Sequence, residues 1–155
     1  MEFAMLKPKH AAGFSLIEVL VALLVTAVGV MGTVATHLNT IKFNKTSEVR
    51  SHATMLAYEI TDRMRANRNA ALSGNYDISI GADAPTGTAN TIAQADLQNW
   101  FTALTARLSL GDGAIASNGN VFTITVQWDE NRISSSRQAD ANGDHLQSFV
   151  FVTEL

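Results

Sequence analysis

The side chain with the most distinctive chemical setting in this sequence is the carboxylate of Glu18. It stands directly before residues 19–36, an apolar run of 18 residues without a single charged side chain. As a helix this run spans roughly 27 Å, and together with residues 14–17 it is long enough to cross a bilayer. A carboxylate near a bilayer core is costly and rarely lacks a partner. A plain apolar anchor therefore leaves Glu18 unexplained.

The remaining ionisable residues form no recognisable catalytic motif. His37, His52 and His145 are scattered, and no paired carboxylates or phosphate-binding loop accompany them, so we expect neither an enzyme nor a cofactor. Residues 140–144, Asp-Ala-Asn-Gly-Asp, resemble the start of a calcium loop, but no Glu follows at the twelfth place. We expect a polar turn there and no metal. The absence of cysteine excludes disulfides and thiolate metal sites.

The segment before the apolar run is short and mildly basic, with Lys7 and Lys9, and it ends at Gly13. These lysines favour a cytoplasmic location for the N-terminus and export of the rest of the chain. One alternative is a conventional signal peptide cut after a small residue such as Ala35, although the apolar run is longer than usual for that. A second alternative is a plain single-span anchor.

Residues 13–23, Gly-Phe-Ser-Leu-Ile-Glu-Val-Leu-Val-Ala-Leu, resemble the leader junction of type IV prepilins and pseudopilins. The resemblance implies that a prepilin peptidase cuts between Gly13 and Phe14 and N-methylates Phe14. It divides the chain into a leader (1–13), a transmembrane and filament-core helix (14–36) and a periplasmic pilin-like domain (37–155). Cleavage would also give Glu18 a partner, the new amine of its own or a neighbouring subunit, which would set the register between subunits.

Beyond the apolar run the pattern predicts a second helical half. No Gly or Pro occurs in residues 37–72, and one apolar stripe recurs at helical spacing: Val49, Ala53, Leu56, Ile60 and Met64. Glu59 and Arg63 are spaced to form an i, i+4 ion pair. The prediction is one continuous helix as far as Leu72, ended by Gly74 as a C-terminal cap.

The rest of the chain predicts one further helix and a small sheet. We expect residues 75–95 to form a long surface loop and Asp96 to cap a helix with an apolar stripe: Leu97, Trp100 or Phe101, Leu104 and Leu108. Asn118-Gly119 predicts a hairpin turn. The following strand alternates, with Phe122, Ile124, Val126 and Trp128 on one face, and residues 147–153 form a last strand. The prediction is therefore an α+β pilin-like fold, with a long helix packed on an antiparallel sheet.

Three arginines in six residues, Arg63, Arg65 and Arg68, form a further cluster. They are interpreted either as a solvated helix end, where cations are favoured, or as a patch that binds a partner. Nucleic acid is not an expected partner, because the chain is acidic, with a net charge of −3, and no aromatic residues interleave with the arginines. The stretch Arg-Met-Arg-Ala-Asn-Arg also resembles the minor pilins of the type IV pilus modification protein PilV family. Asp96 to Trp100 and Val126 to Asp129 extend that resemblance.

The resemblance implies a minor pilin, active in pilus assembly and through the pilus in adhesion and motility. The chain would be held in the inner membrane until it enters a filament at the cell surface. Expected partners are the prepilin peptidase, other minor pilins, the major pilin, and the inner-membrane assembly platform with its motor. The alternatives are a minor pseudopilin of type II secretion, which shares the leader junction, and a membrane-anchored periplasmic binding domain.

Overall fold

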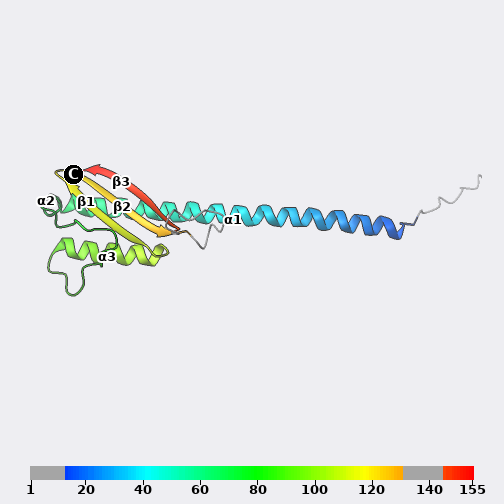
Figure 1. Ribbon diagram of the computed structural model, residues 1–155, viewed down its shortest axis with the longest axis horizontal. Helices are drawn as coiled ribbons and strands as arrows, with labels where there is room; N and C mark the ends of the chain where they lie inside the picture. The colour runs from blue at the N-terminus through cyan, green and yellow to red at the C-terminus, as the bar shows by residue number, and fades with distance from the viewer. Residues whose placement is uncertain (1–12, 131–144) are drawn as a thin grey trace, which may run out of the picture. The chain divides into compact units, whose positions relative to one another are not determined.

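The computed structural model describes residues 13–130 and 145–155. Three helices precede three strands: α1 (Leu16–Ala66), α2 (Arg68–Leu72), α3 (Ile92–Arg107), β1 (Asp112–Asn118), β2 (Val121–Asp129) and β3 (Leu146–Glu154), as Figure 1 shows. The predicted α+β pilin-like fold, a long N-terminal helix with a small antiparallel sheet, is confirmed. The chain divides into two compact units between Thr40 and Ile41.

The long helix stops six residues earlier than the sequence pattern predicted. α1 ends at Ala66, and Asn67 leaves the helical conformation with φ −118° and ψ 44° before the short α2 begins. The predicted glycine cap is confirmed at the end of α2. Gly74 has φ +76°, and the amides of Gly74 and Asn75 donate to the carbonyls of Ala71 and Ala70 at 2.9 and 3.1 Å. This pair of hydrogen bonds is the Schellman motif, which satisfies carbonyls that a helix end leaves free.

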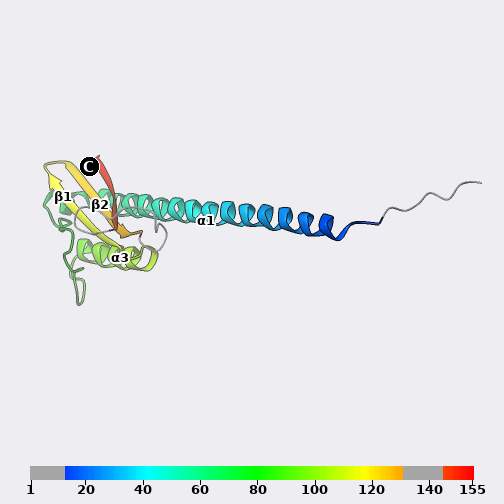
Figure 2. The ribbon, with the colours of Figure 1, turned by 45° about the vertical axis from the view of Figure 1, so that its right-hand side comes forward.

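The sheet has three antiparallel strands in the order β1-β2-β3. β1 and β2 form the predicted hairpin, with Gly119 at φ +66°, and Figure 2 shows the tight connection between them. β2 alternates as predicted, because Phe122, Ile124, Val126 and Trp128 are all buried. The last strand is confirmed with slightly wider bounds, and it pairs with β2 from Val121↔Glu154 to Asp129↔Leu146.

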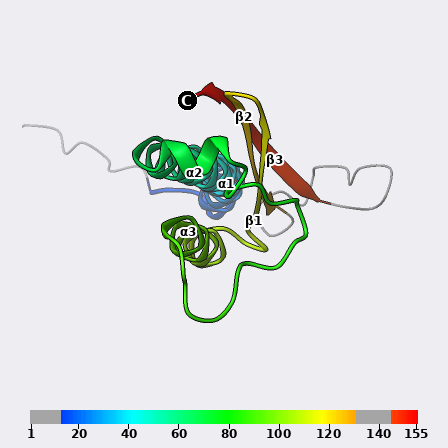
Figure 3. The same cartoon turned by 90° about the vertical axis from the view of Figure 1, so that its left-hand side faces the viewer.

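The helices of the second unit cover one face of this sheet (Figure 3). All five residues of the predicted α1 stripe are buried. The α3 stripe is buried as well, and both Trp100 and Phe101 belong to it. The ring of Trp100 lies so close to Gly113 that a Cβ atom on Gly113 would come within 2.4 Å of it. The core is therefore a three-part contact between α1, α3 and the inner face of the sheet.

The predicted loop is shorter than expected and partly tied down. α3 begins at Ile92, inside the range assigned to the loop, because the Thr91 hydroxyl caps it by accepting from the Gln94 amide at 3.1 Å. Ile78 and Ile115 exchange two backbone hydrogen bonds of 2.9 Å, which attach the loop to β1. Residues 140–144, interpreted above as a polar turn, lie outside the described residues, as does the leader up to residue 12.

Candidate functional site

The predicted cleavage junction lies just before α1. Gly13, Phe14 and Ser15 are exposed and non-helical, and the Ser15 carbonyl accepts from the amides of Glu18 and Val19 at 3.1 and 3.2 Å. A Cβ atom added to Gly13 would meet nothing within 4 Å. Among the described residues there is therefore no steric reason for glycine at position 13.

Glu18 occupies the first turn of α1, where a carboxylate is favoured by the free amides of the helix N-terminus. Its side chain is exposed and makes no hydrogen bond or ion pair among the described residues. The nearby apolar side chains are exposed as well, for example Ile17 at 66% and Val21 at 55%. Among the residues that the structure describes, no cation pairs with this carboxylate, which stays open to water and to a cation from elsewhere.

The apolar half of α1 is a candidate membrane span. A stretch of α1 has mean hydropathy 2.3 with none of it buried, so α1 is long and apolar enough to cross a membrane. Its hydroxyl groups are already satisfied: Thr26, Thr33 and Thr36 each donate to the carbonyl four residues earlier, at 2.6 to 3.1 Å. Threonine hydroxyls that are hydrogen-bonded within their own helix are compatible with a lipid surface, where unpaired polar groups are costly.

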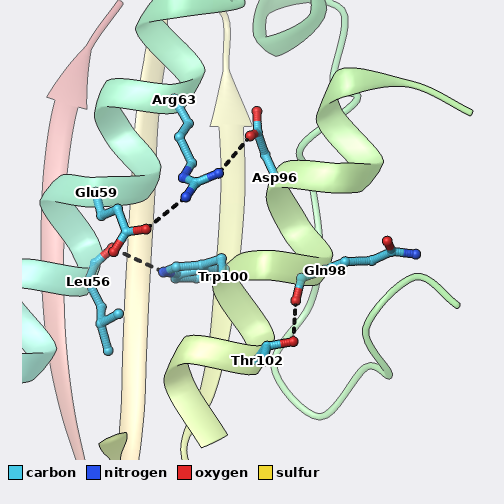
Figure 4. A network of polar contacts seen from close by, with 7 residues as sticks. All are labelled: Leu56, Glu59, Arg63, Asp96, Gln98, Trp100 and Thr102. Atoms are coloured by element: carbon cyan, nitrogen blue, oxygen red, sulfur yellow. Dashed lines mark hydrogen bonds and ion pairs between the residues drawn. The ribbon is translucent and has the colours of Figure 1, made fainter. Parts of the chain in front are cut away.

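The arginine cluster belongs to the other compact unit, and its members behave differently from one another. Arg63 lies between two carboxylates and donates to Glu59 at 2.9 Å and to Asp96 of α3 at 3.0 Å (Figure 4). The predicted Glu59–Arg63 pair is thereby confirmed. The hydrogen bond with Asp96, and to a smaller extent that with Glu59, raises the pKa of the Arg63 guanidinium above its usual value. Arg63 is thus an internal link between α1 and α3.

The prediction that Asp96 caps α3 is wrong, because α3 begins four residues earlier. Asp96 instead lies inside the helix and is buried, where it accepts from Arg63 and, at 2.6 Å, from the Tyr76 hydroxyl. Burial and this hydrogen bond raise the pKa of Tyr76 to about 12, so its proton stays in place for donation. The side-chain amide of Asn67 donates to the same hydroxyl at 3.1 Å. Sequence reasoning missed Tyr76 and Asn67 in this network.

Arg65 and Arg68 reach the end of β3. Arg65 donates to Asp62 at 3.1 Å and to the Thr153 hydroxyl at 3.2 Å, and Arg68 donates to the Leu155 carbonyl at 2.8 Å. All three contacts are exposed, so they contribute little to stability. Arg65 and Arg68 are therefore the members of the cluster whose charge remains accessible to a partner.

Comparison with known proteins bears on the N-terminal unit. Residues 8–34 match the family model described as the prokaryotic N-terminal methylation motif. No match was found among curated proteins or among solved structures. The motif, the exposed apolar helix and the small sheet together support a type IV pilin-like or pseudopilin-type protein that is processed by a prepilin peptidase and anchored in a membrane. Proteins of this kind are typically structural.

Proposed function

We propose that this chain is a minor pilin of a type IV pilus and acts when pilus assembly begins. One observation carries the proposal: within a matched methylation motif, Glu18 stands at the start of the exposed apolar half of α1, without a partner among the described residues. A lone anchor has no use for such a carboxylate, whereas a subunit that must find its register beside the helices of other subunits does.

The proposed mechanism begins with cleavage between Gly13 and Phe14 and N-methylation of Phe14. The new amine lies four residues from Glu18, at the same end of α1. In the membrane Glu18 pairs with that amine, which offsets the desolvation cost of both charges. In a filament Glu18 pairs with the amine of a neighbour, and a slip of one turn would leave two charges unpaired in a low dielectric.

Residues 14–36 then serve in two apolar surroundings in turn. While the subunit waits, they span the inner membrane and residues 37–155 form the periplasmic domain. On assembly the exposed side chains of α1 exchange lipid for the helices of other subunits. The assembly platform and its motor would supply the work, and other minor pilins together with the major pilin would be the neighbours.

The minor-pilin assignment rests on the resemblance of Arg63 to Arg68 to the type IV pilus modification protein PilV family. The geometry refines the proposed partner patch, since Arg63 is committed to Asp96 while Arg65 and Arg68 stay accessible. The principal alternative is a minor pseudopilin of type II secretion, which would use the same junction and the same carboxylate. Deleting the gene distinguishes them: loss of surface pili favours our proposal, and loss of protein secretion with normal pili favours the alternative.

Processing provides the direct test of the junction. We expect Gly13→Leu to abolish cleavage, because the bulky side chain would stand at the bond that the peptidase must bind. The described residues leave room for that side chain, so the change should not disturb the fold. The uncleaved chain should keep its helix and its folded domain. Mass spectrometry of membrane-extracted wild-type protein should find N-methylated Phe14 at the N-terminus. An intact Met1, or a start near Thr36, would contradict the assignment.

The accessible arginines provide a second test. Replacing Arg65 and Arg68 together by Gln should cost well under about 1 kcal/mol of stability, since their contacts are exposed. Binding of the domain to other minor pilins should weaken, as it should for the wild type in raised salt, which screens charges beyond about 8 Å. The measurement is pull-down with melting temperature recorded in parallel.

Arg63→Gln is the matched control, because it removes one positive charge from the same cluster but breaks the contact with Asp96. It should lower the melting temperature more than the double variant does. If the double variant binds as the wild type does and melts equally, the arginines are not the interface.

A further inference from the structure

A bare turn of α1 separates the apolar span from the folded domain. Ile41 is 64% exposed and Phe43 is 74% exposed, and Lys42 and Lys45 are exposed beside them. The first buried residue of α1 is Val49. Nothing in the described part of the second unit covers the side chains of Ile41 and Phe43. Two large apolar side chains thus stand exposed among charged residues.

The two apolar side chains point to different sides of the helix. Two residue steps at 3.6 residues per turn place Ile41 and Phe43 about 200° apart. Before assembly, a single partner helix would pack against one side and leave the other side in water. A lipid–water boundary surrounds a helix that crosses it, and therefore covers both.

The lysines fit the same boundary. Lys42 makes no ion pair among the described residues, and Lys45 has a partner in Glu48 at 3.0 Å, an exposed contact that lowers the pKa of Glu48. Lysines at a span's end extend their ammonium groups toward lipid headgroups while their methylene stems cover apolar surface. Lysines on the exported side also oppose the orientation set by cytoplasmic lysines, so their presence calls for another use.

The spacing along α1 agrees with a crossing of the whole bilayer. The chain is helical without a break from Leu16 to Lys45. At about 1.5 Å per residue, these 29 steps cover roughly 44 Å, which compares with about 40 to 45 Å for a bilayer including its headgroups. When the amine of Phe14 lies at the cytoplasmic surface, Lys42 to Lys45 therefore reach the opposite headgroup layer.

We propose that Lys42, Phe43 and Lys45 form a second membrane anchor, in which the two ammonium groups bind lipid phosphates and Phe43 lies at the edge of the acyl chains. This inference rests on the proposed membrane-held state of the subunit. The anchor fixes the depth of α1 before assembly and holds the domain just above the membrane. Leaving the membrane then requires release of these headgroup contacts.

The test uses the full chain, whose lack of cysteine allows a single fluorescent label. Labels are placed at Asn44→Cys beside the anchor, at Val25→Cys within the span, and at Asn118→Cys in the hairpin. The protein is reconstituted in vesicles of phosphatidylethanolamine and phosphatidylglycerol that carry a nitroxide quencher on either the headgroup or the acyl chain. We expect headgroup quenching at position 44, acyl-chain quenching at position 25 and neither at position 118.

Variants of the labelled chain then separate the contribution of the two lysines from that of Phe43. Adding Lys42→Gln and Lys45→Gln to the Asn44→Cys chain should lower the ratio of headgroup-bound to water-exposed label roughly fivefold per lysine in these anionic vesicles. Phe43→Ala should lower it too, whereas Lys42→Arg, which keeps the charge, should not. Equal quenching in all four chains would overturn the anchor.

The labels also distinguish the failure of this inference from failure of the proposed function. If position 25 escapes the acyl-chain quencher, the chain is not held in the membrane and the proposed function fails with the anchor. If position 25 is quenched but position 44 behaves like position 118, only the second anchor is wrong. If position 44 becomes protected only after assembly into filaments, a neighbouring subunit covers this turn instead of lipid.

Discussion

Glu18→Ala is expected to leave membrane insertion and leader cleavage intact while removing the protein from filaments. Insertion depends on the apolar run, and cleavage depends on the residues around Gly13, neither of which this change alters. Assembly would leave the amine of a neighbour buried without a counter-charge, at a cost of several kcal/mol. Because each 1.4 kcal/mol is about a tenfold change in equilibrium, incorporation should fall more than tenfold.

The measurement compares the amount of the protein in sheared filaments with the amount in membranes. Glu48→Ala is the matched control, since Glu48 is a carboxylate on the same helix whose side chain is 52% exposed in the second unit and pairs with Lys45. We expect wild-type incorporation for that variant. Glu18→Gln should resemble Glu18→Ala, because an amide cannot neutralise an amine. Normal levels of either Glu18 variant in filaments would refute the charge-pair mechanism.

Trp100→Ala is expected to destabilise the domain by about 3 to 5 kcal/mol, a large share of the stability of a typical domain. Trp100 is completely buried, lies against Gly113, and donates its indole N–H to the Leu56 carbonyl at 3.0 Å (Figure 4). Its removal opens a cavity where α1, α3 and the sheet meet. No neighbouring element can close this space without moving the others.

Trp100→Phe separates packing from hydrogen bonding, because phenylalanine keeps an aromatic ring and loses the N–H donor. It should cost clearly less than Trp100→Ala. Thr102→Ala is a control on the same helix, since its hydroxyl bonds the Gln98 carbonyl at an exposed position. Urea unfolding of each variant, followed by circular dichroism, gives the free energies. A cost below about 1 kcal/mol for Trp100→Ala would mean that this junction is not the centre of the core.

The apolar patterns of the sequence predicted the main elements because those patterns are local. One face of β2 and the stripe of α1 were identified from spacing alone, and both are buried. Asn118-Gly119 predicted the hairpin because its turn requires a left-handed residue, which glycine supplies. The resemblance to a prepilin leader junction likewise rests on consecutive residues, and the methylation-motif match at residues 8–34 covers the same segment.

The polar contacts of the domain were decided only by the tertiary structure. Asp96 lies 33 residues from Arg63 and 20 from Tyr76, so no local pattern links them. Asp96 is of a residue type that often caps helices, so the sequence pattern predicted a helix start there. In the folded domain Asp96 is instead buried beside Arg63 and accepts its hydrogen bond. The contact of Asn67 was equally invisible to local patterns, since its side-chain amide donates to the hydroxyl of Tyr76, nine residues further on.

The sequence by itself determined where this chain is apolar, where it turns, and which carboxylate lacks a reason to be there. These properties depend on the spacing of neighbouring residues and on the length of one run. Only the tertiary structure separated the three arginines into one internal link and two accessible charges, because the difference depends on how the distant Asp96, Thr153 and Leu155 approach α1 and α2. Folding brings such partners within hydrogen-bond distance, and their spacing in the sequence does not record it.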